Sequence, residues 1–354
     1  MKTIKKILSL FIIIFVFPAV AYSDCRGCCS GHGGVVCIDN VTQCDDGSPL
    51  SEKCKEKGCN QCSDNIIPPD PKYPDPVLPE QIVDENSNTI KIASFNIRIF
   101  GKTKAANEVV MNQLVKIINK FDIVAIQEIR DISGTAIEEL ENIVDQSGVD
   151  YQVVVGPRLG RTSSKEQYAY FYRTSKIVFA SAYTYDDTNQ DMFHREPFIA
   201  KFHTTNGHFD FVLLTIHTDP DEATEEINAL PLVISDAQDH FSDEQDFIIL
   251  GDLNADCNYY DEDDPNNIIE SSDYYWLIND GEDTNVASSS CTYDRIIVLE
   301  SSMEDVTGNF GVYRYDLELG LTPEETSDVS DHYPVWAEFY IDKDSDTEPV
   351  TVED

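Results

Sequence analysis

The chain has 354 residues, of which 41% are hydrophobic, so it can bury a substantial core in one large domain with accessory segments or in two modest domains. It carries 25 basic and 65 acidic residues, and the net charge of −40 argues against tight binding of nucleic acid over the whole surface. We interpret the acidity as a means of keeping an exported protein soluble. Any phosphate binding would depend on a local positive strip and on metal ions.

The N-terminus has the pattern of a secretory signal peptide. Lysines form a positive segment, an apolar stretch follows over residues 7–17, and small residues lead to a cleavage site before Asp24. The alternative is a membrane anchor, but the apolar stretch is short for a spanning helix. We therefore predict a signal peptide over residues 1–23, a secreted mature protein (extracellular or periplasmic) without a membrane span, and a bacterial source.

Eight of the ten cysteines lie in residues 24–62, a module with too few apolar residues to fold unaided. An even number of cysteines in an exported chain predicts disulfides, whose pairing is open; the alternative is a zinc site that includes His32. Residues 63–81 are rich in proline and predict an extended linker. Residues 343–354 form an acidic tail that we expect to be disordered. The cysteines of the module are Cys25, Cys28, Cys29, Cys37, Cys44, Cys54, Cys59 and Cys62.

From residue 82 to residue 342 the pattern is that of an α/β domain. Short apolar runs predict strands, and apolar residues at helical spacing predict helices. Many strands with a few interspersed helices predict two packed sheets flanked by helices. In chain order we expect a strand at 90–97, a helix around 110–121, a strand at 122–126, a helix around 137–144, strands near 151–155, 168–172, 177–182, 198–202 and 209–216, a helix near 222–240, and strands at 246–250, 295–299 and 335–341.

Polar residues stand where four of these apolar runs end. Strands that begin at one edge of a sheet deliver their last residues to one rim, so these side chains are expected to converge. Asp294 and the pair Asp331–His332 precede two later runs, and they reach the same rim if those strands run in the opposite direction. One polar residue at a strand end is usually a turn or cap residue, but six such instances favour a site. The residues that end the first four runs are Asn96, Gln127, Glu128, His217, Asp252 and Asn254.

These residue types predict metal-assisted hydrolysis of a phosphodiester. Carboxylate and amide oxygens suit a hard cation such as Mg²⁺, which would neutralise the charge that develops on the phosphate. Two histidines can share the proton transfers, each oriented by a carboxylate, for which Glu166 and Asp294 are candidates. Four other histidines are expected at the surface: His194, His203, His208 and His240. The candidate ligands of the cation are Asn96, Glu128, Asp252 and Asp331.

At these residues the sequence resembles the deoxyribonuclease I family. The matching segments occur in the family's order, span residues 90–341 and are highly specific in combination, whereas any one alone would indicate only the broader endonuclease/exonuclease/phosphatase superfamily. The segments are 92–101 (IASFNIRIFG), 121–131 (FDIVAIQEIRD), 160–168 (GRTSSKEQY), 195–197 (REP), 214–217 (LTIH), 250–257 (LGDLNADC), 291–295 (CTYDR) and 330–334 (SDHYP).

The resemblance implies a two-sheet α/β sandwich with its catalytic site on the rim described above. It implies two acid–base dyads, Glu166 with His217 and Asp294 with His332, that hydrolyse DNA to 5′-phosphate and 3′-hydroxyl ends with little sequence preference. DNA is then the partner, and we expect a monomer with no obligate protein partner. The further implied roles are metal binding by Asn96, Glu128, Asp252 and Asp331, catalysis and contact with the scissile phosphate by Asn254, catalysis by Asp252, and DNA contacts by Arg98, Arg130 and Arg195.

The resemblance also implies structural features away from the dyads. Cys257 and Cys291 match a family disulfide. The resemblance implies Mg²⁺ as the catalytic ion, with Mn²⁺ as a substitute, and Ca²⁺ as a structural ion. One calcium site matches Asp187, Asp191, the carbonyl of Phe193, and Glu196. A second matches Asp283, Asn285, Ala287 and Ser289, although an alanine offers no side-chain ligand. In both loops the alternative is simple solvation of acidic residues.

Some positions depart from the family pattern. Thr162 and Ser164 replace larger groups that press on the DNA minor groove, which leaves the preference for duplex over single strands or RNA open. A phosphodiesterase or phosphatase acting on lipid or small-molecule phosphates is the alternative, but the sequence lacks the apolar rim loop that such an enzyme favours. A non-catalytic binding protein on an inactive scaffold would lack an acid–base residue, and all of them are present.

Overall fold

The computed structural model describes residues 35–38, 41–44, 88–260, 267, 269 and 273–344. The chain divides into two compact units, Met1–Gln81 and Ile82–Asp354. In the first unit, β1 (Val35–Ile38) and β2 (Val41–Cys44) pair as antiparallel strands. The predicted signal peptide, the cysteine side chains of the N-terminal module, the proline-rich linker and most of the acidic tail lie outside the described residues.

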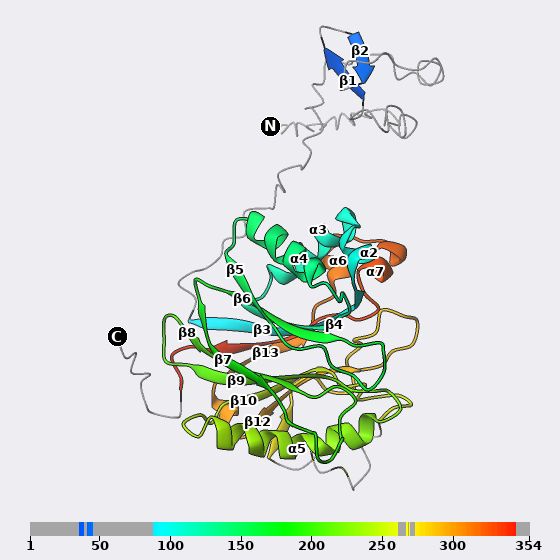
Figure 1. The fold of residues 1–354 in the computed structure, drawn as a ribbon. Helices are drawn as coiled ribbons and strands as arrows, with labels where there is room; N and C mark the ends of the chain where they lie inside the picture. The colour runs from blue at the N-terminus through cyan, green and yellow to red at the C-terminus, as the bar shows by residue number, and fades with distance from the viewer. Residues whose placement is uncertain are drawn as a thin grey trace, which may run out of the picture. The chain divides into compact units, whose positions relative to one another are not determined.

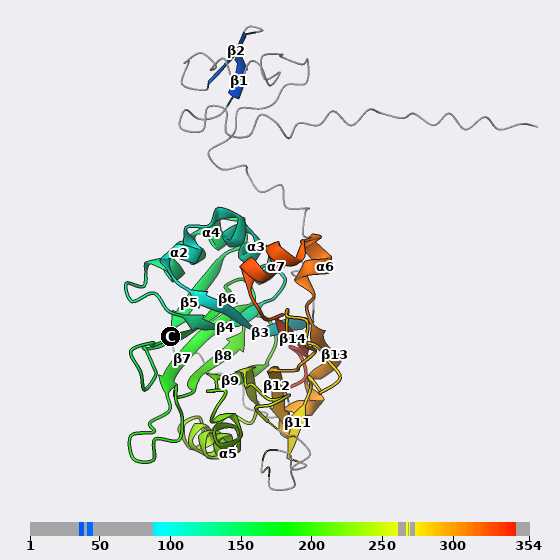
Figure 2. The same ribbon diagram turned by 90° about the vertical axis from the view of Figure 1, so that its right-hand side faces the viewer.

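The second unit contains two six-stranded sheets, and Figures 1 and 2 show them stacked face to face. The first sheet has the order β13-β14-β3-β4-β6-β5, and the second has the order β11-β12-β10-β9-β8-β7. The strands of the first sheet are β3 (Thr89–Phe100), β4 (Ile123–Ile129), β5 (Tyr151–Val155), β6 (Gln167–Arg173), β13 (Val306–Val312) and β14 (Val335–Tyr340). Those of the second are β7 (Ile177–Thr184), β8 (Phe198–Thr204), β9 (Asp210–His217), β10 (Phe247–Asp252), β11 (Tyr274–Trp276) and β12 (Asp294–Leu299).

Helices cover the outer face of each sheet. Figure 1 shows α2, α3, α4, α6 and α7 over the first sheet and α5 under the second. Three apolar clusters follow from this layering: one under the first group of helices, one between the sheets, and one between the second sheet and α5. The helices are α2 (Lys102–Ala105), α3 (Glu108–Ile118), α4 (Thr135–Gln146), α5 (Ala223–His240), α6 (Tyr315–Leu319) and α7 (Pro323–Val329), with a 3₁₀ turn, η2, at Ser301–Glu304.

The layering explains why the central strands have nearly continuous apolar sequences. β4 and β9 are buried along their whole length, because one face of each meets the opposite sheet and the other face meets helices. Burying a large apolar side chain stabilises the fold by about 1.5–3 kcal/mol, so such strands are specified mainly by hydrophobicity rather than by alternation. The predicted two-sheet α/β sandwich is confirmed.

Strand direction brings the polar run ends to one rim. β3 runs parallel to β4, and β9 runs parallel to β10, so the ends of each pair lie together. β14 is antiparallel to β3 and β12 is antiparallel to β10, so the starts of β14 and β12 reach the same edge. The elements α2, α6, α7, β11 and β13 were not predicted from the sequence. Among the residues that the structure describes, no helix is long and apolar enough to cross a membrane.

Candidate active site

Asp252, the last residue of β10, occupies the centre of the rim of the second sheet. It pairs across the sheet with His217, the last residue of β9, and with Asp294, the first residue of β12. The preceding Gly251 allows this approach, since a Cβ at Gly251 would lie 1.9 Å from the carbonyl oxygen of Ile216. Strand register therefore places three candidate catalytic residues side by side.

Irregular strand ends bring residues of the first sheet to the same place. The register shifts after Asn96 in β3 and after Ile126 in β4, which marks bulges in both strands. Glu128 has a φ of 62°, in the left-handed region that is costly for residues with a Cβ. Its carboxylate Oε2 accepts the backbone N–H of Ile99 at 2.8 Å. The bulge thus turns Glu128 into the rim.

The buried amide of Asn96 joins the two sheets at the site. Its Nδ2 donates to Glu128 Oε1 at 3.2 Å and to Asp252 Oδ2 at 2.9 Å. Its Oδ1 accepts the backbone N–H of Arg98 at 2.9 Å, which fixes the orientation of the amide. Asn96 therefore holds a carboxylate of each sheet at a fixed separation.

The first predicted dyad is present and buried. Glu166 Oε2 lies 2.9 Å from His217 Nδ1, and the backbone N–H of His217 donates to the hydroxyl of Tyr168 at 2.9 Å. Burial alone would raise the pKa of Glu166, but the hydrogen bond with His217 and the charges of His217, Arg195 and Arg130 lower it to about 2. Burial and Arg195 lower the pKa of His217, whereas Asp252 and Glu166 raise it, and the net shift is upward. Glu166 therefore stays ionised and fixes the imidazole.

The second predicted dyad is also formed. His332 Nδ1 lies 2.8 Å from Asp294 Oδ2, and Asp294 is fully buried. Burial lowers the pKa of His332, but the charges of Asp294 and Asp252 outweigh this and raise it to about 10. Burial raises the pKa of Asp294 to about 6, although His332 opposes that shift. The arrangement therefore favours the protonated imidazole of His332.

Both dyads point toward one carboxylate. Asp252 Oδ2 lies 3.5 Å from His217 Nε2 and 3.4 Å from His332 Nε2. Burial raises the pKa of Asp252, but the two histidines and the hydrogen bond from Asn96 lower it below its usual value. Two imidazoles with their Nδ1 atoms held by carboxylates thus converge on one ionised group, which is the geometry needed for paired proton transfers.

The oxygen-rich part of the site fits a hard divalent cation. The carboxylates of Glu128 and Asp252 both accept hydrogen bonds from Asn96 Nδ2. Asp331 is a third carboxylate at the site, with its Oδ1 3.8 Å from His332 Nε2. Arg130 Nη2 lies 2.9 Å from Glu128 Oε2, so the site already attracts a positive charge. Asn96 faces the carboxylates with Nδ2, so coordination through its Oδ1 would require the amide to turn over.

The three predicted DNA-contacting arginines have different environments. Arg98 is half-exposed, with Nε 3.3 Å from Asp331 Oδ2. Arg130 bridges Glu128 and Glu166, each at 2.9 Å. Arg195 is only 5% exposed. It donates to the carbonyl oxygens of His217, the last residue of β9, and of Thr218, the next residue. Its geometry disfavours direct DNA contact, because the guanidinium braces the strand that carries a dyad.

Asn254 lies two residues beyond the rim of β10 and is buried. Its backbone N–H donates to Asp252 Oδ1 at 3.2 Å, and its Nδ2 donates to the carbonyl oxygen of Thr218 at 3.1 Å. Its φ is 47°, which is the left-handed conformation that asparagine tolerates better than most residues. The side chain is therefore held at the site by the loop after β9.

Comparison with known proteins identifies the family and several relatives of this chain. Residues 93–332 match the model of the Endonuclease/Exonuclease/phosphatase family. Deoxyribonuclease-1 of Bos taurus is 38% identical over 258 residues, covering 70% of this chain and 91% of the relative. Deoxyribonuclease-1-like 1 of Homo sapiens is 35% identical, covering 77% and 91%, and deoxyribonuclease gamma of Mus musculus is 36% identical, covering 70% and 83%.

The chain belongs to the endonuclease/exonuclease/phosphatase family. Within it, the chain is a deoxyribonuclease I-like hydrolase, and membership implies dependence on a divalent cation. Two solved structures share the fold. The structure of humanized D. rerio TDP2 has a TM-score of 0.52 and 14% identity, and the match covers 72% of this chain and 99% of that one. The structure of an endonuclease/exonuclease/phosphatase of Bacteroides vulgatus has a TM-score of 0.51 and 16% identity, with coverage of 72% and 99%. The three sequence relatives are mammalian and lend no support to the predicted bacterial source.

In this deoxyribonuclease I-like hydrolase the first predicted calcium loop offers a suitable ligand. Asp187 is 5% exposed, and its Oδ2 accepts the backbone N–H of Phe193 at 2.7 Å. Its buried Oδ1 has no hydrogen-bond partner among the described residues, which suits a ligand of a cation. Asp191 is exposed and pairs with Arg161 at 2.9 Å, and Glu196 is half-buried nearby in sequence.

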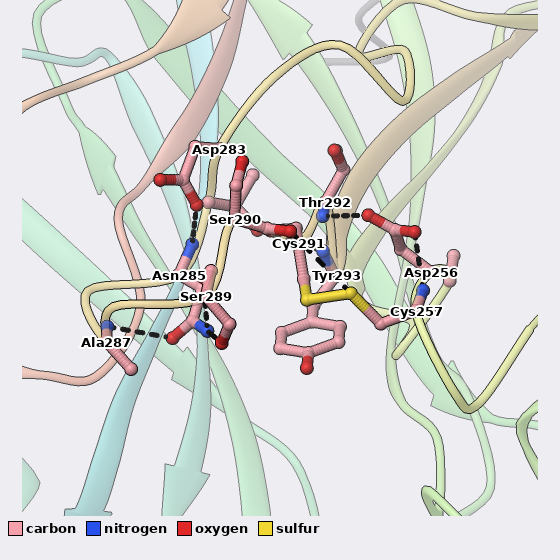
Figure 3. Close-up of a disulfide and its surroundings, with 12 residues drawn as sticks. Asp256, Cys257, Asp283, Asn285, Ala287, Ser289, Ser290, Cys291, Thr292 and Tyr293 are labelled. Carbon is pink, nitrogen blue, oxygen red and sulfur yellow. Dashed lines mark hydrogen bonds between the residues drawn. A yellow bond between two sulfur atoms is a disulfide. The ribbon is translucent and has the colours of Figure 1, made fainter.

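The second predicted calcium loop closes on itself. Figure 3 shows Asn285 at its centre: Nδ2 donates to the carbonyl oxygen and the hydroxyl of Ser289, both at 3.0 Å, and Oδ1 accepts the N–H of Ala287 at 3.0 Å. Asp283 Oδ1 accepts the N–H of Asn285 at 3.2 Å. These contacts order the loop from within, and calcium binding there stays a prediction.

The predicted disulfide between Cys257 and Cys291 is formed, beside this loop in Figure 3. It connects the segment after β10 to the segment before β12, so it supports the positions of Asn254 and Asp294. It also rules out a metal site at Asp256, although two sulfur atoms lie near that carboxylate. A structural disulfide is consistent with an oxidising compartment.

Several residues that support the site were not singled out from the sequence. The Tyr168 hydroxyl and the Thr218 carbonyl contact the His217 strand and Asn254, respectively. Arg295 is fully buried and donates to the carbonyl oxygen of Ala255 at 2.6 Å, one residue after Asn254. Arg295 could have been predicted from the sequence, because it directly follows Asp294. The contacts of Tyr168 and Thr218 depend on tertiary structure.

Proposed function

We propose that this protein is a secreted, divalent-metal-dependent endonuclease that hydrolyses phosphodiester bonds of DNA with little sequence preference. The observation that carries the proposal is the convergence of two His–carboxylate dyads on Asp252, beside Glu128 and Asn96. The named activities of the deoxyribonuclease relatives, which align over most of their length, support DNA as the substrate.

The two imidazoles divide the proton transfers. One histidine accepts a proton from the attacking water, whose oxygen bonds to phosphorus, and the other donates a proton to the 3′ oxygen as the P–O bond breaks. The products are 5′-phosphate and 3′-hydroxyl ends. Glu166 and Asp294 hold the Nδ1 atoms, so each Nε2 is the atom that exchanges a proton with the reactants.

The remaining rim residues bind and orient the phosphate. In this proposal Asn254 contacts a phosphate oxygen, and Glu128, Asp252 and Asp331 would hold Mg²⁺ or Mn²⁺. The cation supplies charge neutralisation on the phosphate when bound. Asn96 orients the carboxylates that bind it. We propose structural Ca²⁺ at Asp187 and its loop.

A local basic strip reconciles the acidic chain with an anionic substrate. Lys104 Nζ donates to the carbonyl oxygen of Arg98, and Arg158 donates to the carbonyl oxygens of Arg130 and Lys165. These five basic residues lie next to the strand ends that carry the catalytic groups. Phosphate contacts there would position the duplex, while the overall charge favours release of product.

Export to an extracellular or periplasmic site rests on the leader pattern and on the disulfide of the catalytic unit. The same reasoning extends to disulfides in residues 24–62, a proline-rich linker over 63–81 and a catalytic domain over 82–342. We propose that the protein acts as a monomer, since catalysis as described uses residues of one chain.

The test is cleavage of supercoiled plasmid by the oxidised mature protein with Mg²⁺ and Ca²⁺. We expect nicking, and we expect it to disappear with a chelator and in His217→Ala. Absence of cleavage of duplex and single-stranded DNA by folded, metal-loaded protein would refute the proposal. Hydrolysis of lipid or small-molecule phosphates in the same samples would then support the alternative activity.

A further inference from the structure

A buried carboxylate on α5 connects two loops behind the first dyad. Glu226 is fully buried, and its Oε1 accepts the backbone N–H of His194 at 3.0 Å and that of Asp219 at 3.3 Å. His194 precedes β8, and Asp219 follows β9. A second contact joins the same loops, because His194 Nδ1 lies 3.2 Å from Asp219 Oδ2. His194 is half-buried for this reason and does not lie freely at the surface.

These loops carry groups that contact the catalytic residues. Arg195 follows His194 directly, and its Nε donates to the carbonyl oxygen of His217 at 2.9 Å. Its Nη2 donates to the carbonyl oxygen of Thr218 at 2.9 Å, one residue before Asp219. Because Glu226 holds the residues on both sides of this contact, it fixes where Arg195 meets the end of β9.

From there, two short paths lead to the reaction centre. Arg195 Nε lies 3.8 Å from Glu166 Oε2, the oxygen that bonds to His217. The carbonyl oxygen of Thr218 also accepts Nδ2 of Asn254 at 3.1 Å. A shift of the loops held by Glu226 would therefore displace both the dyad carboxylate and the amide that we place at the phosphate.

Packing alone does not account for a glutamate at this position. Its neighbours on α5 include the buried apolar residues Ile227, Leu230 and Val233, so an apolar side chain would fill the space without desolvating a carboxylate. Burial raises the pKa of Glu226 to about 7, against the two backbone hydrogen bonds and the charge of Arg195. Glu226 therefore contributes its acceptor oxygen Oε1, because the backbone N–H groups of His194 and Asp219 would otherwise be buried without a hydrogen-bond partner.

We propose that Glu226 is a positioning residue for hydrolysis, acting through Arg195 and Thr218 on the Glu166–His217 dyad and on Asn254. This inference rests on the proposed function only in assuming that the reaction is hydrolysis of a phosphodiester. Although the side chain of Glu226 has no access to the substrate, we expect it to affect the rate of the chemical step.

The structure offers a matched control at the opposite rim of the same sheet. The side chain of Glu244 is also fully buried, and its Oε1 accepts the backbone N–H groups of Gln245 at 3.0 Å and Asp246 at 2.7 Å. Burial likewise raises its pKa, to about 9. Glu244 therefore resembles Glu226 in burial and in accepting two backbone N–H groups, although its Oε2 also lies 3.3 Å from Lys201 Nζ. It lies before β10, at the end of that strand remote from Asp252.

The experiment compares kcat and KM of Glu226→Ala, Glu226→Gln and Glu244→Ala on plasmid DNA and on bis(4-nitrophenyl) phosphate, with the melting temperature of each. We expect Glu226→Ala to lower kcat on both substrates by about 10²-fold, because small misplacements of catalytic groups have effects of that size, with KM little changed. Glu226→Gln keeps the acceptor oxygen and should recover most of kcat. Glu244→Ala should lose stability but keep kcat.

Three outcomes would overturn the inference: equal kcat losses in Glu226→Ala and Glu244→Ala, a loss confined to KM, or no recovery in Glu226→Gln. If Glu226→Ala does not fold, Glu226→Met fills the same volume without an acceptor and carries the same expectation. A wild-type enzyme that hydrolyses only the small diester would refute DNA as substrate and still test Glu226. A folded wild-type protein inactive on both substrates would refute both proposals.

Discussion

Replacing Glu166 by glutamine should separate the catalytic and stabilising roles of one buried carboxylate. Glu166 Oε2 bonds to His217 Nδ1 at 2.9 Å, and Oε1 lies 2.9 Å from Arg130 Nη2. Glutamine keeps the shape but removes the charge that both partners face. We expect kcat to fall by about 10³- to 10⁴-fold, the effect of replacing the carboxylate that orients a catalytic histidine.

The effect on stability follows from the pKa of Glu166. The fold lowers this pKa from 4.5 to about 2, so the ionised carboxylate favours the folded state. Each tenfold change in proton affinity corresponds to about 1.4 kcal/mol, which gives a contribution of about 3 kcal/mol. Because the folded pKa is the lower one, the contribution is complete above pH 4.5 and disappears as the pH falls toward 2.

Urea unfolding of wild type and Glu166→Gln at pH 7 and at pH 3 tests this reasoning, together with plasmid nicking at pH 7. The difference in unfolding free energy should be largest at pH 7 and should shrink at pH 3. Glu141→Gln on α4 is the control: burial raises the pKa of Glu141, so this variant should not show the same acid dependence. A difference independent of pH, or a nearly active variant, would refute the assigned role.

Three further changes have defined outcomes. Asp252→Asn should lower kcat by about 10²- to 10³-fold in the nicking assay, since both imidazoles and Asn96 face this carboxylate; an active variant would contradict the site. Replacing Cys257 and Cys291 by serine should lower the unfolding free energy by roughly 4 kcal/mol in urea titrations, given their separation of 34 residues, and an unchanged midpoint would count against this. Asp187→Ala should weaken Ca²⁺ binding by about 10- to 100-fold in calorimetric titrations, and unchanged affinity would exclude this loop as the site.

The sequence was informative where chemistry and hydrophobicity are local. Apolar runs such as residues 247–250 predicted buried strands, and the polar residues that end them predicted a shared rim. The dyad partners were predicted correctly because each histidine and carboxylate stands in a short, recognisable segment. The short elements α2, α6 and β11 were missed, since segments of three to five residues carry too little periodicity.

The environment of Arg195 shows what a short segment leaves undetermined. Its sequence context suggested a contact with DNA, but folding buries the guanidinium against two backbone carbonyls. Whether an arginine faces solvent or braces a strand depends on which backbone groups the fold leaves without partners. That is a property of the assembled sheets and not of the segment.

The sequence by itself predicted most of the strands, the order of the proposed catalytic residues and the chemistry that they support, because residue type and period are properties of the chain. Only the tertiary structure decided the bulges that turn Glu128 inward, the burial of Arg195 against the end of β9, and the role of Glu226 behind the dyad. Each of these depends on hydrogen bonds between residues distant in sequence or on backbone conformations that packing must stabilise, and such contacts leave no pattern in the sequence.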